Sequence, residues 1–276
     1  MMSLFNFNEE EMLSFFAVFV RYGTLFAVLP FVGDRIVPIP VKVLLSLAVT
    51  VALFPVLVSS GSVNPGEAQR WAATTGGIVS TISMEVILAL ILGFTAKMIF
   101  ETINFGGNLV GNFMGLASAS TFDPHQESQT QVAAELQMAI AMLLFLAMDG
   151  HHLLLKASLD SYHIVGIGGF AALGKSVFGS DMTQRLVHLS AQVIAFGLEL
   201  AAPVALSMFV VNAVFGIMSK AMPSMNILIL SFSVLALVGM FVMWLEIPVF
   251  HDAVAGLFTR MGESMEGVMQ AMAHGK

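Results

Sequence analysis

Long apolar runs separated by short polar stretches make up most of this sequence. A transmembrane helix needs roughly 20 mainly apolar residues to cross about 30 Å of hydrocarbon. Runs that approach or exceed this length cover residues 12–32, 41–58, 78–100, 132–148, 186–218 and 226–250. The fourth run can extend to Leu155. The pattern therefore predicts an all-α membrane protein with about six apolar helical segments.

The fifth run, residues 186–218, is too long for one straight span. Its roughly 33 residues would reach about 50 Å as a helix, well beyond the hydrocarbon thickness. Pro203 lies near the middle of the run and removes one helical hydrogen bond. We therefore expect either a kinked helix or a helical hairpin in this part of the chain.

Residues 251–276 follow a different pattern. Here apolar residues recur at helical spacing between polar ones, at Val254, Leu257, Phe258, Met261 and Met265. One apolar stripe on an otherwise polar helix is typical of a helix that lies on a surface. We expect an amphipathic surface helix.

Composition supports a membrane protein and excludes several other classes. Of the 276 residues, 57% are hydrophobic and 11% are charged, whereas an ordinary soluble domain has about 25% charged residues. We therefore expect residues 1–276 to form a single membrane domain. The net charge of −7 and the lack of a basic run exclude nucleic-acid binding. The lack of cysteine excludes disulfides and thiolate metal sites.

Four charged residues interrupt the apolar runs: Arg21, Glu85, Lys97 and Glu199. Each would cost about 2.5–3.5 kcal/mol at the centre of a bilayer. They can snorkel or pair inside the protein, or they can face partner protein or water. The pattern favours the second interpretation for Arg21 and Glu199. Because lysines and arginines fall on both sides in either orientation, simple up-and-down threading is not expected.

The most informative segment is glycine-rich and reads GGNLVGNFMGLASASTFDP over residues 106–124. Gly107, Gly111, Gly115 and Ala119 recur every four residues, which places small side chains in one stripe of a helix. The segment ends with Asp123 and Pro124, a turn signal. Tight helix packing and a mobile, pore-lining element are both consistent with this spacing.

Several motifs resemble the FliR family of flagellar protein-export components. The stretch 107–124 is followed by FLAMDGHH at 145–152. Earlier in the chain, PFVG at 30–33 precedes Ile39, Pro40 and Lys42, and later AMPSMN occupies 221–226. The resemblance spans nearly the whole chain, in order and at similar spacing. Ser224 stands where the family commonly has glutamine.

The resemblance implies a channel-forming structural subunit rather than an enzyme. FliR joins FliP and FliQ in a right-handed helical assembly around an export channel, and FlhB contacts the channel entrance. By this resemblance, residues 1–185 would be the FliP-like part and residues 186–276 the FliQ-like part. The expected location is the bacterial inner membrane, in the flagellar basal body. Unfolded flagellar proteins would pass through the channel, and the helices would pack on neighbouring subunits and membrane lipid.

In the FliR family, the segment that matches residues 106–124 acts as a plug that narrows the pore. The residues assigned to this plug are Gly107, Gly111, Phe113, Met114, Gly115, Phe122, Asp123 and Pro124. Methionine repacks around irregular shapes, and glycine lowers the cost of backbone movement. A hydrophobic constriction can also gate by dewetting. The resemblance therefore predicts a deformable seal.

Two further patterns resemble enzyme or metal motifs without the required context. Residues 169–176 match the P-loop pattern G-x-x-x-x-G-K-[ST], but they lie in a short linker between helical segments, so a flexible turn is expected. His151 and His152 are adjacent, which on a helix points them about 100° apart. Asp149 and His152 can share a face, although a polar cap at a helix end is the simpler interpretation. We expect no catalytic residues, no cofactor and no metal.

One function from another class is also consistent with broken helices and charges near the membrane centre. A multi-pass secondary transporter for a small solute has both features. A transporter would work as a single protein or homo-oligomer, whereas an export-gate subunit would depend on FliP and FliQ.

Overall fold

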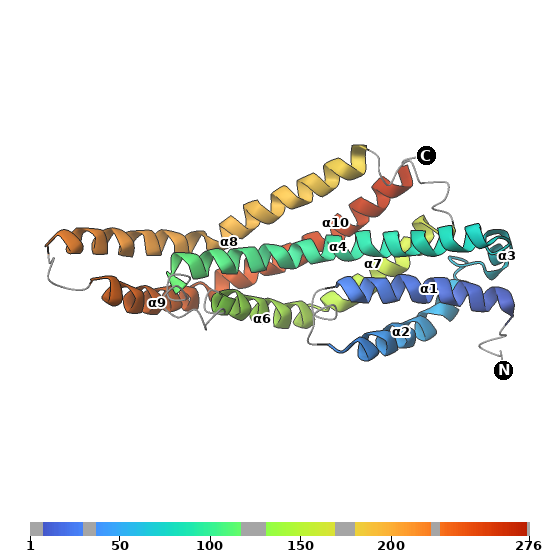
Figure 1. Ribbon diagram of the computed structural model, residues 1–276, viewed down its shortest axis with the longest axis horizontal. Helices are drawn as coiled ribbons and strands as arrows, with labels where there is room; N and C mark the ends of the chain where they lie inside the picture. The colour runs from blue at the N-terminus through green and yellow to red at the C-terminus, as the bar shows by residue number, and fades with distance from the viewer. Residues whose placement is uncertain (1–7, 30–36, 117–130, 169–179, 222–226, 275–276) are drawn as a thin grey trace. The chain divides into compact units, whose positions relative to one another are not determined.

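The computed structural model of the protein describes residues 8–29, 37–116, 131–168, 180–221 and 227–274 (Figure 1). The elements are α1 Glu9–Val28, α2 Ile39–Ser59, η1 Pro65–Glu67, α3 Ala68–Trp71, α4 Thr75–Phe113, α6 Gln131–Ala147, α7 Gly150–Ile164, α8 Ser180–Ala221, α9 Ile227–Leu245 and α10 Ile247–His274. No β-strand occurs within these ranges. The prediction of an all-α protein is confirmed.

The apolar helices have the lengths that a membrane requires. Four of them, α1, α2, α4 and α8, are each long and apolar enough to cross a bilayer. Two further pairs pass the same test as broken spans, with bends of 67° between α6 and α7 and 62° between α9 and α10. Counting each pair as one span gives up to six spans, which confirms the expectation of about six apolar segments, some of them broken.

The fifth apolar run forms one helix and not a hairpin. α8 has 42 residues and continues through Pro203, so the hairpin alternative is wrong. Figure 1 shows that α8 bends along its length, as expected where proline removes the bond to the carbonyl four residues earlier. The chain does not need to reverse because the helix on each side of the proline keeps its own hydrogen bonds.

α7 is the helix that the hydrophobic pattern missed. The fourth apolar run extends only to Leu155, whereas α7 spans Gly150–Ile164. Its polar residues include Ser158, Asp160 and Ser161, which break the apolar run, and its 15 residues are too few to form a span without α6. Two of these, Ser158 and Ser161, are buried in the folded chain. α7 is therefore held by packing against other helices.

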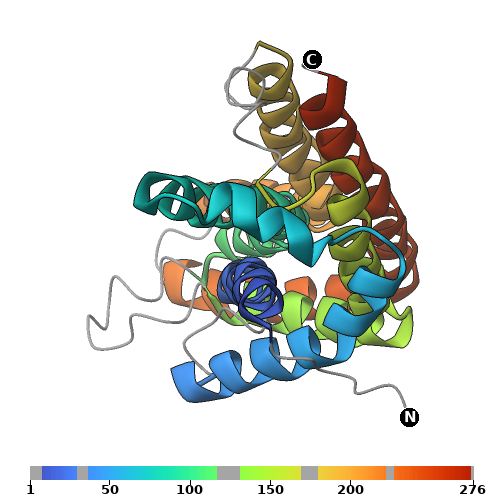
Figure 2. The same cartoon turned by 90° about the vertical axis from the view of Figure 1, so that its right-hand side faces the viewer.

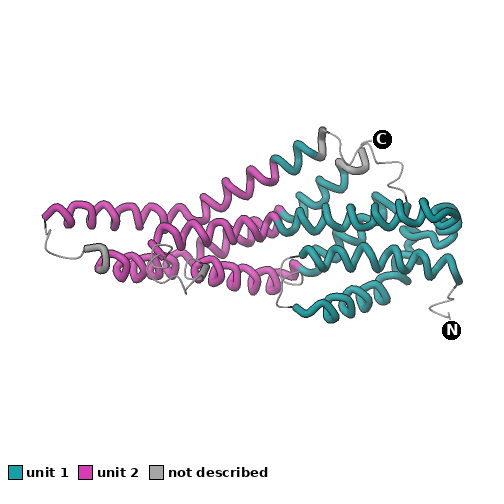
Figure 3. The backbone as a smooth tube through the Cα atoms, viewed as in Figure 1, with its two compact units in different colours: residues 1–97, 151–187, 261–276 teal, residues 98–150, 188–260 magenta. Residues whose placement is uncertain are grey.

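The chain forms two compact units, which alternate along the sequence (Figure 3). Unit 1 consists of Met1–Lys97, His151–Val187 and Met261–Lys276, and unit 2 of Met98–Gly150 and His188–Arg260. The assignment of 1–185 and 186–276 to FliP-like and FliQ-like parts concerns similarity to other proteins. The division into compact units does not test this assignment, which stays a prediction.

Unit 1 is organised around α1, which lies between α2 and the first part of α4 (Figure 1 and Figure 2). Tyr22 and Leu25 of α1 and Leu92 of α4 are almost completely buried. Gly93 of α4 lies close to α1, because a Cβ built on it would be 3.0 Å from the Cβ of Val28. Small and apolar residues thus bring these helices together.

Unit 2 has its own hydrophobic core. Its buried members come from α4 and the residue just after it, and from α6, α8 and α9: Val110, Met114, Ala133, Ala201, Val204, Met208 and Leu235. A second group consists of Phe100, Phe145 and Phe258, whose ring centroids lie 5.1–5.3 Å apart. Two of the three ring pairs pack edge-on and the pair Phe100–Phe258 is tilted; such aromatic packing adds to the burial of apolar surface.

The amphipathic character predicted for residues 251–276 appears in α10, although its apolar stripe is not a membrane-facing surface. The five apolar side chains of that stripe are all buried within the protein: Val254, Leu257, Phe258, Met261 and Met265. The periodicity was therefore interpreted correctly, but the partner of the stripe is the rest of this chain.

Candidate functional site

A buried ionic cluster holds three helices of unit 1 together. Arg21 of α1 is completely buried, and its Nε donates a hydrogen bond to Glu85 Oε2 of α4 at 2.5 Å. Its two terminal nitrogens donate to Ser161 Oγ at 3.0 Å and to the Val165 carbonyl at 3.2 Å. The guanidinium carbon also lies 3.7 Å from the centre of the Tyr162 ring.

This cluster corrects one interpretation of the sequence. Arg21 was expected to face partner protein or water, but it pairs with Glu85, 64 residues away in the same chain. A buried guanidinium is tolerated only when an opposite charge and hydrogen-bond acceptors surround it. Since Glu85, Ser161 and Val165 supply these, Arg21 needs no partner outside the chain.

The other two charges of the apolar runs are in a different position. Lys97 of α4 and Glu199 of α8 both have exposed side chains in this chain. They are therefore not buried charges within the chain. The expectation that they contribute to assembly stays a prediction.

The glycine-rich stretch begins as the tightly packed end of α4. A Cβ built on Gly107 would lie 2.5 Å from the Cα of Ala134 in α6, and one on Gly106 would lie 3.1 Å from the Gly197 carbonyl oxygen of α8. Gly111 is also buried. Only glycine allows backbones to approach so closely. Up to Phe113 the stretch is thus a packed helix.

Just after α4, Met114 inserts its side chain into a notch on α9. Met114 is 3% exposed, and a Cβ built on Gly239 would lie 2.5 Å from its Cγ. The next residue, Gly115, has φ of +74° and lies near Phe232 of α9. Such a backbone favours glycine. Gly239 had no signal in the sequence beyond being one glycine within an apolar run.

The residues expected to form the plug thus fall into three groups. Gly107, Gly111 and Met114 are buried within unit 2, and Gly115 is partly buried. Phe113 is 42% exposed at the end of α4. Phe122, Asp123 and Pro124 lie outside the described residues. Their assignment to a plug stays a prediction.

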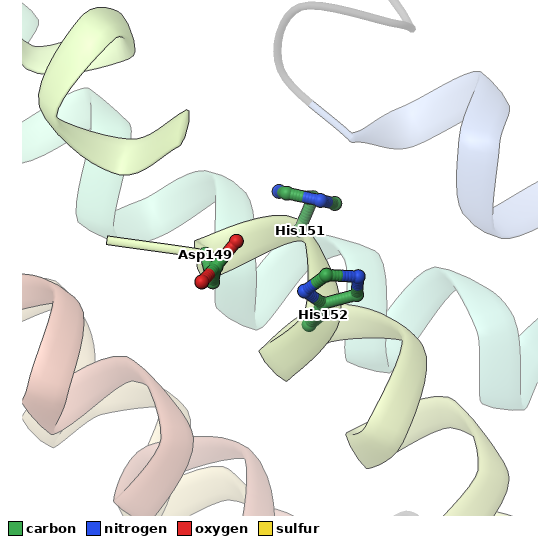
Figure 4. Close-up of side chains that lie close together, drawn as sticks. All are labelled: Asp149, His151 and His152. Carbon is green, nitrogen blue, oxygen red and sulfur yellow. The ribbon is translucent and has the colours of Figure 1, made fainter. Parts of the chain in front are cut away.

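The turn between α6 and α7 brings together three side chains that could bind a metal (Figure 4). One possible ligand atom from each of Asp149, His151 and His152 lies within 4.8 Å of the others. All three are exposed, and Asp149 has φ of +56°, as a turn residue. The geometry alone describes a polar turn at a helix start.

The P-loop-like residues 169–176 lie outside the described residues, so the expectation of an interhelical turn stays untested there. For the rest of the chain, we find no grouping of side chains suited to catalysis among the described residues. The features with defined geometry are the ionic cluster of unit 1 and the packed end of α4 in unit 2.

Comparison with known proteins shows the relationship of the chain. Residues 12–261 match the family described as bacterial export proteins, family 1. The flagellar biosynthetic protein FliR of Pectobacterium carotovorum subsp. carotovorum is 24% identical, over 98% of this chain and 99% of that protein. FliR of Escherichia coli strain K12 is 25% identical, over 92% and 93%. The surface presentation of antigens protein SpaR of Shigella sonnei is 24% identical, over 83% and 82%.

Proposed function

Because the chain belongs to the bacterial export proteins, family 1, and is a FliR family member, we propose that it is a channel-forming subunit of the flagellar type III export gate. The match over residues 12–261 is the observation that carries this proposal. In this role the chain is a structural part of the export apparatus in the bacterial inner membrane. Its partners are FliP, FliQ and FlhB, and its cargo is unfolded flagellar protein.

Large apolar surfaces of unit 2 support assembly with other membrane subunits. On α8 and α9, exposed apolar side chains include Leu206, Phe209, Val210, Ile217, Leu237, Met240, Phe241 and Trp244. Exposed apolar side chains in this number on two helices must be covered by lipid or by protein. FliP and FliQ would cover part of it, and lipid the rest.

We further propose that the segment 106–124 forms a seal with two functional parts. Gly107 and Met114 anchor its beginning by close packing on α6 and α9. Phe113, exposed at the end of α4, and residues 117–124 would reach the pore. An anchored base, followed by small residues and the aromatic Phe122, suits a seal that closes against ions and yields to an unfolded chain.

Co-expression with cognate FliP and FliQ, followed by native mass spectrometry, tests the proposed function. A gate subunit is recovered in a hetero-complex that contains both partners. A secondary transporter is instead recovered as a homo-oligomer that moves a small solute after reconstitution. Recovery of such an active homo-oligomer without a hetero-complex would contradict the proposal.

Deletion of residues 117–122 tests the seal, because it leaves the packed residues up to Leu116 in place. We expect greater ion leak through the assembled complex, measured as conductance in planar bilayers. As a matched control, a deletion of the same length in the linker 169–179 should leave conductance unchanged. Unchanged conductance of the 117–122 variant within an intact complex would show that this segment does not seal the pore.

A further inference from the structure

A cavity of about 250 Å³ in unit 2 combines acidic and apolar walls. It lies between α8, near Pro203, and the bend where α9 meets α10, so its walls come from two helices that each depart from regular geometry. Its charged lining residues are Glu199 from α8, Glu246 at the bend, and Asp252 and Arg260 from α10.

Glu246 is the most unusual group in this cavity. Its Oε1 is buried and has no hydrogen-bond partner among the described residues. Its backbone is satisfied, because its N–H donates to the Val242 carbonyl and its carbonyl accepts from the Phe250 N–H. A buried carboxylate oxygen without a donor costs free energy, and a cation or hydrogen-bond donor removes that cost. Glu246 is only partly buried as a residue, and its unpaired Oε1 is an acceptor that an occupant of the cavity can use.

Glu199 adds a second set of acceptors to the same cavity. Glu199 is one of the residues that line the cavity, and its side chain is exposed. Because Pro203 has no N–H, the Glu199 backbone carbonyl also lacks its helical donor four residues later. A guanidinium carries five N–H donors and an ammonium three, so a basic side chain can satisfy several of these acceptors at once.

The basic residue already present does not neutralise these acids. The Arg260 guanidinium carbon lies 4.7 Å from the centre of the Phe196 ring. No ion pair joins Arg260 to a cavity carboxylate among the described residues. Asp252 is 86% exposed and contacts His251 at 3.0 Å. The unmatched acids of the cavity are therefore Glu199 and Glu246.

The surroundings of the cavity indicate what kind of cation fits. Apolar side chains line it, among them Leu200 and the exposed Val249. The wall itself contains Pro203 and Phe250. A free hydrated ion gains little from such surfaces, whereas the aliphatic stem of lysine or arginine packs on them and carries its charge to the acids.

We propose that this cavity binds a basic side chain, lysine or arginine, on an apolar helix of a partner subunit. The proposal rests on the proposed function, because it requires a hetero-oligomer in the membrane. Within a bilayer an unpaired carboxylate is costly. A partner helix with a basic residue at the right position removes this cost, and a helix without one does not. The cavity therefore helps to select the correct partner during assembly.

The test uses complexes of this chain with FliP and FliQ. Four forms of the chain are compared: the wild type, Glu199→Gln, Glu246→Gln and the double variant. Glu135→Gln is the matched control, since Glu135 is an exposed acid of the same unit outside the cavity. The fraction of intact complex is measured by native mass spectrometry over a detergent series. We expect the dissociation constant to rise about tenfold or more for Glu246→Gln. The dissociation constant should rise further for the double variant and should stay unchanged for the control.

Three outcomes would overturn the inference. If the hetero-complex forms and the double variant dissociates like the wild type, the cavity binds no basic side chain. If the effect of the substitutions disappears when aminophospholipid is removed, the occupant is a lipid amine. If the wild-type chain forms no hetero-complex at all, the proposed function fails together with the inference. The thermal unfolding of the isolated variants should match that of the wild type, which separates loss of assembly from loss of folding.

Discussion

The buried pair of Arg21 and Glu85 allows a sharp test of what holds unit 1 together. In a Glu85→Leu variant, Arg21 keeps its bonds to Ser161 and the Val165 carbonyl but loses the only opposite charge that it contacts among the described residues. The guanidinium is completely buried, so water cannot replace the carboxylate without opening the helices. Removal of one partner of a buried ion pair costs about 3–5 kcal/mol.

The double variant Arg21→Met with Glu85→Leu should behave very differently. Replacement of a whole buried pair by apolar residues of similar volume is often neutral or stabilising, by about 1–4 kcal/mol. We therefore expect the double variant to recover most of the stability that Glu85→Leu loses. The coupling energy of the cycle would then be a large fraction of the loss in the single variant.

The free energy of unfolding is measured by denaturant titration in mixed micelles, with tryptophan fluorescence as the signal, for the wild type, both single variants and the double variant. Glu135→Leu, at an exposed position, is the control and should change stability by no more than about 0.5 kcal/mol. A loss below about 1 kcal/mol for Glu85→Leu would refute the reasoning. So would a double variant that is as unstable as the single one.

The remaining predictions concern glycines of unit 2. Gly239→Ala should displace Met114, because the new Cβ would lie 2.5 Å from its Cγ; we expect a loss of about 1–3 kcal/mol and greater ion leak through the assembled complex. Gly107→Ala should destabilise more, since its Cβ would meet the Cα of Ala134, which cannot rotate away; poor recovery of folded protein would show this. Gly216→Ala is the control, with nothing within 4 Å of the new Cβ, and should gain about 0.4–1 kcal/mol; a loss there would contradict the packing argument.

Close helix packing was foreseeable at Gly107 because small residues every four positions leave room for another backbone. The same reasoning could not identify Ala134 as the contact, since the spacing says only that some helix approaches. It also could not separate Met114, which is buried against α9, from its neighbour Phe113, which is 42% exposed. Both side chains are apolar. Their difference in exposure depends on the direction in which the chain leaves the end of α4.

The sequence by itself determined the class of the protein. Apolar runs long enough to cross a bilayer, a low content of charge and ordered family motifs establish a helical membrane protein of the bacterial export family. These properties depend on local composition, which a linear pattern records. Only the tertiary structure decided that Arg21 pairs with Glu85, that α7 is a helix, and that the apolar stripe of α10 is buried. Each of these depends on contacts between residues far apart in the chain, and the free energy of burying a charge is set by the neighbours that folding brings to it.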